Sequence, residues 1–224
     1  MSMLTNLDLL RRVPMFSMLT EAQANSLSEA VIKRRFKRGE RIVDQGQKSN
    51  ALYIILAGHC RVVMTDAKGR EVILATLQTG DHIGEMSLID NEAHSATVEA
   101  ESQTDVLELG REAFTRSLNE SSAMAYSILC GLVPRLRIAD RKIGSLALMN
   151  VYGRVANVLL DAAKASPLND MIIREKLSRQ DIAKMVGASR EMVSRVMKDF
   201  LDQGFIQALE GGAMRIIERR AKPR

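Results

Sequence analysis

The sequence has few of the residues that bind metals or cross-link a chain. Its 224 residues include 2 cysteines, 3 histidines and no tryptophan. Cys60 and Cys130 lie far apart, which excludes a disulfide framework, a zinc-ligand spacing and an iron–sulfur run. We therefore expect no metal site, no prosthetic group and a reducing, cytoplasmic environment.

The sequence also has no long apolar run and no enzymatic motif. Its longest apolar stretch, residues 51–57, is too short to cross a bilayer, and residues 1–12 lack the apolar core of a signal peptide. We expect no membrane partner. The histidines have no metal-binding spacing, and no phosphate-binding loop or dinucleotide fingerprint occurs. Glu85 with His94 is an alternative acid–base pair, but we predict no catalytic residue and no enzyme.

Residues 178–200 have the pattern of two short helices joined by a tight turn. Gly187 suits the positive φ that such a turn needs, and Ser189 suits the N-cap of the second helix. Apolar residues mark the buried face of each helix: Ile182, Met185 and Val186 in the first, and Val193, Val196, Met197 and Phe200 in the second. This spacing predicts a helix-turn-helix, and a plain helical hairpin is the alternative.

Charge favours the helix-turn-helix interpretation. Arg190, Glu191 and Arg195 are left free near the start of the second helix, where such proteins contact base edges. Residues 150–224 carry 14 Lys/Arg and 9 Asp/Glu, so the whole net charge of +5 lies there. A basic C-terminal tail contributes to this excess. A basic module with this helix pair is what a polyanionic partner favours.

Residues 41–109 alternate short apolar runs with turn residues. The runs are RIV, ALYIIL, HCRVVM, EVILATL, SATVEA and DVLEL. Strands at this spacing predict a compact antiparallel roll or barrel. The sequence DAKG at residues 66–69 predicts a hairpin turn, and residues 20–33 predict a helix before the first strand.

A heptad pattern follows the strands. Its members alternate by three and four positions: Leu129, Leu132, Leu136, Ala139, Ile143, Leu146 and Asn150. This is the spacing of a coiled-coil seam, so we expect a long helix that forms a parallel homodimer. Pro134 interrupts backbone hydrogen bonding, which predicts a kink there or a helix that begins nearby.

The C-terminal part completes the pattern of a winged helix-turn-helix. A helix is expected at residues 152–165 and a break at residues 166–170. After Gly204, residues 205–217 predict a short hairpin that turns at the glycine pair 211–212.

With its parts in this order, the chain resembles the CRP/FNR family of bacterial transcription regulators over residues 15–218. The resemblance implies an α+β fold with an antiparallel β-roll. It implies a cyclic-nucleotide-binding-like domain at residues 1–112, a dimerisation helix at residues 113–149 and a winged helix-turn-helix domain at residues 150–224.

The most specific segment of the resemblance is SRQDIAKMVGASREMVSRVMKDFLDQGFI. In it Arg190, Glu191 and Arg195 match the base-reading residues of the catabolite-activator branch, which implies a palindromic site with TGTGA-like half-sites. Double-stranded DNA and RNA polymerase are the expected macromolecular partners. DNA contacts are expected at Arg179, Gln180, Ser189, Arg190, Glu191, Ser194 and Arg195.

The front domain resembles the family's effector pocket between residues 80 and 98. Glu85 matches the carboxylate that holds a ribose hydroxyl, and Ser95 matches a phosphate-binding hydroxyl. The start of a short pocket helix there favours phosphate. Ligand contacts are expected at Gly84, Glu85, Met86, Ser87, His94, Ser95, Ala96, Arg135, Ala139 and Asp140.

Two departures leave the effector open. His94 replaces the arginine that clamps phosphate, and a neutral histidine lacks that charge and fork. Ala139 and Asp140 replace the Thr/Ser pair that reads adenine, and an ionised Asp140 accepts from guanine better. The effector is therefore cyclic AMP, cyclic di-GMP, or another ligand or none. A cyclic-nucleotide-binding regulatory subunit without a DNA role is the alternative class.

Overall fold

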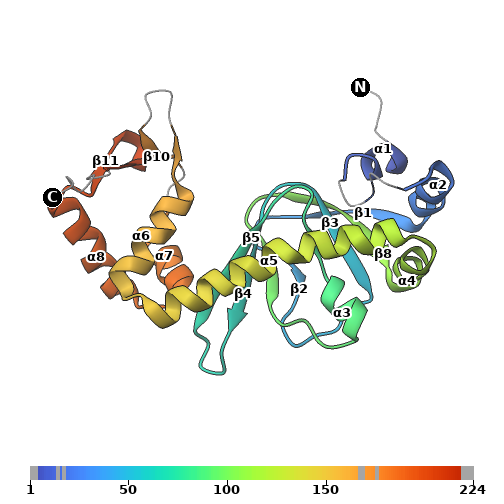
Figure 1. The fold of residues 1–224 in the computed structure, drawn as a ribbon, viewed down its shortest axis with the longest axis horizontal. Helices are drawn as coiled ribbons and strands as arrows, with labels where there is room; N and C mark the ends of the chain where they lie inside the picture. Colours follow the sequence, from blue (N-terminus) through green and yellow to red (C-terminus); the bar gives the residue numbers. More distant parts are fainter. Residues whose placement is uncertain (1–4, 14–15, 17–18, 166–169, 175–176, 218–224) are drawn as a thin grey trace. The chain divides into compact units, whose positions relative to one another are not determined.

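The computed structural model describes residues 5–13, 16, 19–165, 170–174 and 177–217. The predicted break at residues 166–170 therefore lies almost wholly outside the described residues, and so does the basic tail. The chain forms two compact units, Met1–Ile138 and Ala139–Arg224, and its class is α+β, as predicted (Figure 1).

The first unit is a β-roll of two four-stranded sheets with helices on one side (Figure 1). One sheet has the order β1-β8-β3-β6 and the other β2-β7-β4-β5. The strands are β1 (Val31–Phe36), β2 (Arg41–Val43), β3 (Ala51–Ala57), β4 (Cys60–Thr65), β5 (Glu71–Leu77), β6 (His82–Ile83), β7 (Thr97–Ala100) and β8 (Thr104–Gly110). The helices are α1 (Asn6–Leu10), α2 (Glu21–Ala30), α3 (Glu85–Asp90) and α4 (Arg111–Glu120).

Strand β3 is buried on both faces, which explains why its sequence is continuously apolar. Leu52 and Ile54 belong to a core shared with the helices, whereas Tyr53 and Ile55 belong to a second core between the sheets. Successive side chains of a strand point to opposite faces. A strand with a core on each face therefore has no polar alternation.

The helix predicted at residues 20–33 ends at Ala30, and residues 31–36 form strand β1 instead. Only Val31 of this strand is buried, so its sequence lacks the apolar alternation that marks strands. Pairing with β8 along its whole length holds it in the sheet, with ion pairs from Arg34 to Glu108 and from Arg35 to Asp105.

The predicted hairpin turn at residues 66–69 is confirmed between β4 and β5. The Asp66 carboxylate accepts hydrogen bonds from the backbone N–H groups of Lys68 and Arg70. Gly69 has a φ of 75°. A short acceptor side chain followed by a left-handed glycine is the chemistry of such turns.

The long helix α5 (Ser122–Leu148) passes through Pro134 without interruption, so the expectation that the helix begins near the proline is wrong. Asn150 is not part of this helix. Its side chain accepts a hydrogen bond from the Gly153 N–H and caps the next helix, α6 (Val151–Ala162). The predicted seam therefore ends at Leu146.

The second unit is built around helices α6, α7 (Arg179–Val186) and α8 (Arg190–Asp202). A sheet of order β11-β12-β10-β9 completes it. Its strands are β9 (Lys164–Ala165), β10 (Met171–Ile173), β11 (Ile206–Ala208) and β12 (Met214–Ile216). Helix α6 ends at Ala162, earlier than predicted, because Lys164 and Ala165 pair with β10. The predicted hairpin is confirmed as β11–β12, with Gly211 and Gly212 at positive φ.

Candidate DNA interface and effector pocket

The helix-turn-helix has the local chemistry that its sequence predicts. The Ser178 hydroxyl accepts a hydrogen bond from the Asp181 N–H, and the Ser189 hydroxyl accepts one from the Met192 N–H. Gly187 has a φ of 63°. Each helix thus begins at a serine cap, and the turn uses a left-handed glycine.

One face of α8 is buried and the opposite face is exposed. Val193, Val196 and Met197 are each at 0% exposure. Ser194 lies on the opposite face with the three predicted base-reading residues, all exposed. Hydrogen bonds from its own N–H and from Ser189 hold the pKa of Glu191 below its ordinary value. Glu191 is therefore an ionised acceptor beside exposed arginines.

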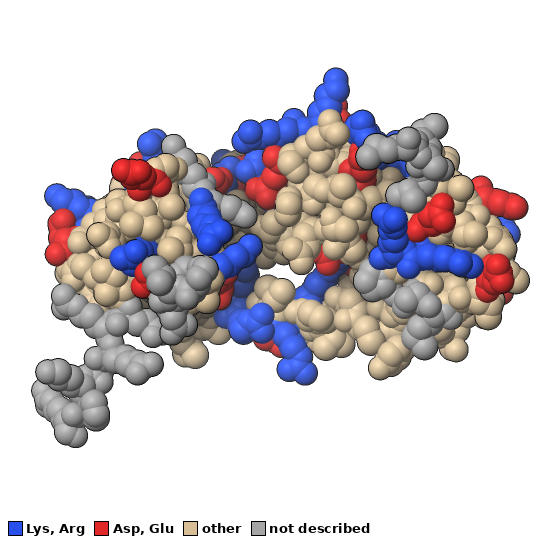
Figure 2. Space-filling model, turned by 90° about the horizontal axis from the view of Figure 1, so that it is seen from above, with Lys and Arg blue, Asp and Glu red and all other residues tan. Residues whose placement is uncertain are grey.

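The remaining predicted DNA residues lie at the start of each helix. Gln180 is exposed, whereas Arg179 is half-buried, and burial lowers the pKa of Arg179. Lys and Arg are interspersed with Asp and Glu over the face of the molecule drawn in Figure 2.

Sequence reasoning missed a link between α6 and α8. The Tyr152 hydroxyl donates a short hydrogen bond to the Asp199 carboxylate. The Tyr152 ring packs edge-on against Phe200, which packs in the same way against Phe205. The two contacts of Tyr152 join residues far apart in the sequence, so no local pattern marks them.

The predicted effector pocket contains a buried carboxylate. Glu85 begins α3 after Gly84, whose φ is 95°. Glu85 is 3% exposed, and its Oε1 accepts a 2.8 Å hydrogen bond from Arg135 Nη1. Burial raises the pKa of Glu85, and the Arg135 charge opposes that shift. The structure therefore brings together two residues that were predicted separately.

His82 lies close to Glu85 and was not selected by sequence reasoning. It is 4% exposed, and its carbonyl accepts a hydrogen bond from Arg135. Burial, reinforced by the Arg135 charge, lowers the pKa of His82 to about 3. A Cβ on Gly131 of α5 would lie 2.5 Å from His82 Cε1. Only a glycine at this position lets the ring lie so close to the helix.

His94 is engaged within the roll. Its Nε2 lies 2.9 Å from the Ser49 hydroxyl, and its backbone N–H donates to the Gln47 carbonyl. Burial lowers the pKa of His94, so the ring is neutral. It therefore does not supply the permanent charge of an arginine.

The other predicted ligand residues differ in exposure. The Ser87 hydroxyl donates to the Glu92 carbonyl, so it supports the loop after α3. Met86 is 54% exposed and Ala96 is buried. Ser95 is exposed, and so are Ala139 and Asp140, which begin the second unit.

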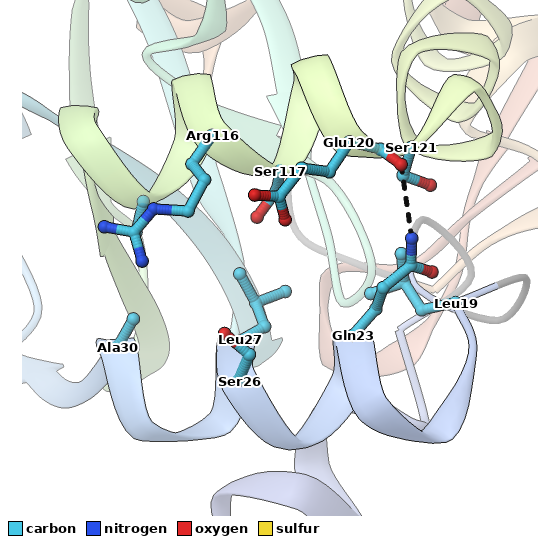
Figure 3. Close-up of a pocket in the computed structure, with 10 residues that line it drawn as sticks. Leu19, Gln23, Ser26, Leu27, Ala30, Arg116, Ser117, Glu120 and Ser121 are labelled. Atoms are coloured by element: carbon cyan, nitrogen blue, oxygen red, sulfur yellow. Dashed lines mark hydrogen bonds between the residues drawn. The ribbon is translucent and has the colours of Figure 1, made fainter.

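A separate groove lies between α2 and α4 (Figure 3). Gln23 donates a hydrogen bond to the Glu120 carbonyl across it. Leu27 and Ala30 line one side, and none of the lining residues belongs to the predicted pocket.

Over the described ranges, no group of three or more His, Cys, Asp or Glu could hold a metal, and no helix is long and apolar enough to span a bilayer.

Two protein families match parts of this chain. Residues 33–121 match the cyclic nucleotide-binding domain family, and residues 153–221 match the Crp-like helix-turn-helix domain family. The cAMP-activated global transcriptional regulator Vfr of Pseudomonas aeruginosa is 33% identical over 180 residues, which cover 78% of this chain and 84% of Vfr. The regulator CRP of Escherichia coli O157:H7 is 34% identical over 170 residues, which cover 75% and 81%.

Solved structures have the same fold. The c-di-GMP-responsive regulator CLP of Xanthomonas campestris has a TM-score of 0.77 at 24% identity, covering 89% of this chain and 100% of CLP. The catabolite activator protein of Thermus thermophilus has a TM-score of 0.53 at 29% identity, covering 92% and 94%.

Proposed function

Because this chain belongs to the CRP/FNR family of cyclic-nucleotide-binding transcription regulators, we propose that it is a homodimer whose affinity for specific DNA sites is set by an effector. The observation that supports this proposal is the division of α8 into a buried apolar face and an exposed charged face. Its buried face is held by Val193, Val196 and Met197, and Arg190, Glu191 and Arg195 remain exposed on the other side.

The exposed residues of α8 suit direct reading of bases in the major groove. Arginine donates two hydrogen bonds to guanine O6 and N7, and an ionised glutamate accepts from a cytosine amine. We propose that Arg190, Glu191 and Arg195 read TGTGA-like half-sites. The other predicted DNA residues, Arg179, Gln180, Ser189 and Ser194, contact the sugar-phosphate backbone of the DNA.

Fluorescence anisotropy with a palindromic TGTGA duplex and a scrambled duplex tests this proposal. Arg190→Ala or Arg195→Ala should weaken specific binding by about 1–3 kcal/mol, roughly 5- to 150-fold, and relax the base preference. Lys198→Ala is the matched control, because it removes one positive charge from an exposed position of the same helix. It should change affinity little and equally for both duplexes. Unchanged affinity in both arginine variants would refute the assignment.

We propose that the dimer forms along the apolar seam of α5. Leu129, Leu136, Ile143 and Leu146 are each more than half exposed in the single chain. Leu132, which lies between Leu129 and Leu136 in the seam, is half-buried against the core of the roll. Exposed apolar side chains at heptad spacing mark an interaction surface and fit a parallel pair of helices. Leu136→Lys should shift the protein from dimer to monomer in sedimentation velocity, whereas a variant that stays dimeric would contradict this seam.

We propose a cyclic nucleotide as the effector and cyclic AMP as its first candidate, because Vfr and CRP are named as cAMP-activated. Glu85 with Arg135 is a buried, charged place for a sugar hydroxyl. Cyclic di-GMP is the second candidate, because the side-chain oxygens of Asp140 accept hydrogen bonds and suit the N–H edge of guanine. Calorimetric titration with cyclic AMP, cyclic GMP and cyclic di-GMP separates them.

The remaining parts of the proposal follow from this assignment. Effector binding favours one of two arrangements of the dimer through a hinge at residues 150–153, which requires tighter binding to the active arrangement. The domains are residues 1–112, 113–149 and 150–224. The protein acts on DNA in the cytoplasm with RNA polymerase and catalyses no reaction. DNA affinity that no cyclic nucleotide changes would refute the effector control and leave DNA binding intact.

A further inference from the structure

Two buried polar atoms in the effector pocket face each other without partners. Glu85 Oε2 and His82 Nε2 lie 4.0 Å apart. Their side chains are 4% and 5% exposed, and neither atom has a hydrogen-bond partner. A buried unsatisfied donor or acceptor is costly, so each such group in a folded protein needs an explanation.

The surrounding contacts keep these two atoms from reaching other partners. Arg135 donates to Glu85 Oε1 and to the His82 carbonyl, which fixes one oxygen of the carboxylate and the backbone beside the ring. Gly131 of α5 lies close to the Cε1 edge of the ring. Both side chains are therefore held in place while Oε2 and Nε2 remain unsatisfied.

The distance between the two atoms suits one bridging hydroxyl group. At 4.0 Å they are too far apart for a direct hydrogen bond. An oxygen about 2.8 Å from each of them would make two ordinary hydrogen bonds at an angle of about 90°. The imidazole is neutral, because burial lowers the pKa of His82 to about 3. With its hydrogen on Nε2, it donates to an oxygen whose own hydrogen goes to the carboxylate.

We propose that one ribose hydroxyl of the bound nucleotide bridges His82 and Glu85, so that His82 determines the specificity for a ribose over a deoxyribose. This inference rests on the proposed cyclic-nucleotide effector. The resemblance to the family assigned the ribose hydroxyl to Glu85 alone. A site built to bind a hydroxyl on both sides rejects an analogue that lacks it, because its buried partners are left unpaired. A trapped water is the rival occupant of the same position.

Isothermal titration calorimetry with ribose and 2′-deoxyribose ligands tests the proposal. The probes are cyclic AMP, cyclic di-GMP and the 2′-deoxy analogue of each. The wild type should bind the ribose form roughly tenfold or more tightly than the deoxy form. His82→Phe keeps the ring shape and removes the donor, and it should reduce that ratio by about five- to tenfold. His82→Gln keeps an N–H donor and should retain most of the ratio. His59→Gln, an exposed histidine of the roll, is the matched control and should leave the ratio unchanged.

The ratio of two affinities on one protein does not depend on the fraction of molecules that fold correctly. If His82→Phe keeps the wild-type ratio, the pair holds a water and the proposal is overturned while the effector assignment stands. If the wild type binds the ribose and deoxy forms equally, the proposal is likewise overturned. If the wild type binds none of the nucleotides, the proposal and the effector assignment fail together.

Discussion

Gly131→Ala should destabilise the protein although it replaces a glycine inside a helix. The added Cβ would lie 2.5 Å from His82 Cε1, whereas carbon atoms in contact are about 3.5–4.0 Å apart. Either the ring or α5 must therefore move by about 1 Å. Arg135, one turn further along α5, is bonded to Glu85 and to the His82 carbonyl, so the displacement also strains these hydrogen bonds.

The magnitude follows from two opposed effects. Alanine gains about 0.5–1 kcal/mol over glycine in a helix interior, and overpacking costs about 1–3 kcal/mol. We expect a net loss of up to about 2.5 kcal/mol in the free energy of unfolding. Gly144→Ala is the matched control, because Gly144 lies in the same helix and a Cβ there would meet nothing within 4 Å. It should gain about 0.5–1 kcal/mol.

Urea unfolding at a fixed protomer concentration measures both variants, since the stability of an oligomer depends on concentration. The double variant His82→Ala with Gly131→Ala completes a mutant cycle. Removing the ring should recover the alanine gain, with a coupling energy of at least about 1 kcal/mol between the two sites. A Gly131→Ala variant as stabilised as Gly144→Ala would refute the contact and the reasoning built on it.

Three further changes test other parts of the structure. In acid, the unfolded chain protonates His82 below pH 6.5 while the folded chain, with a pKa of about 3, stays neutral. Stability therefore falls by up to about 1.4 kcal/mol per pH unit from pH 6.5 down to about 3, and His82→Phe should remove this contribution in urea titrations. Tyr152→Phe removes the hydroxyl that donates to Asp199 and should lower DNA affinity in anisotropy, because α8 loses a tether to α6. Gly187→Ala places a Cβ at a φ of 63°, which should cost about 1–2 kcal/mol in thermal unfolding.

Each of these three predictions has an outcome that would contradict it. Equal acid sensitivity in wild type and His82→Phe would mean that the folded ring titrates normally. The raised pKa of Glu85 has the opposite sign, since it favours the folded chain as pH falls, and it is present in both proteins. For Tyr152→Phe, the ring contact with Phe200 is kept, so unchanged DNA affinity would show that the hydroxyl does not position α8. A Gly187→Ala variant as stable as the wild type would contradict the turn geometry.

Local chemistry made several elements predictable. The serine caps of α7 and α8, the turn at Gly187 and the DAKG hairpin each depend on residues within a few positions of one another. The same holds for the apolar face of α8, where spacing alone selects Val193, Val196, Met197 and Phe200; the first three are buried and Phe200 is half-buried. Apolar periodicity did not predict strand β1, because this strand is held by pairing with β8 and not by burial. It also failed at β9, where pairing with β10 ends the preceding helix.

The sequence by itself determined which residues α8 exposes to a partner, because a helix with one apolar stripe must bury that face. It also determined the class of fold, through the order of strands, long helix and helix pair. Only the tertiary structure decided which side chains meet inside the predicted effector pocket. His82 and Glu85 come from one segment and Gly131 and Arg135 from another, and contacts between distant segments leave no periodic signal. Their meeting depends on how α5 packs against the roll.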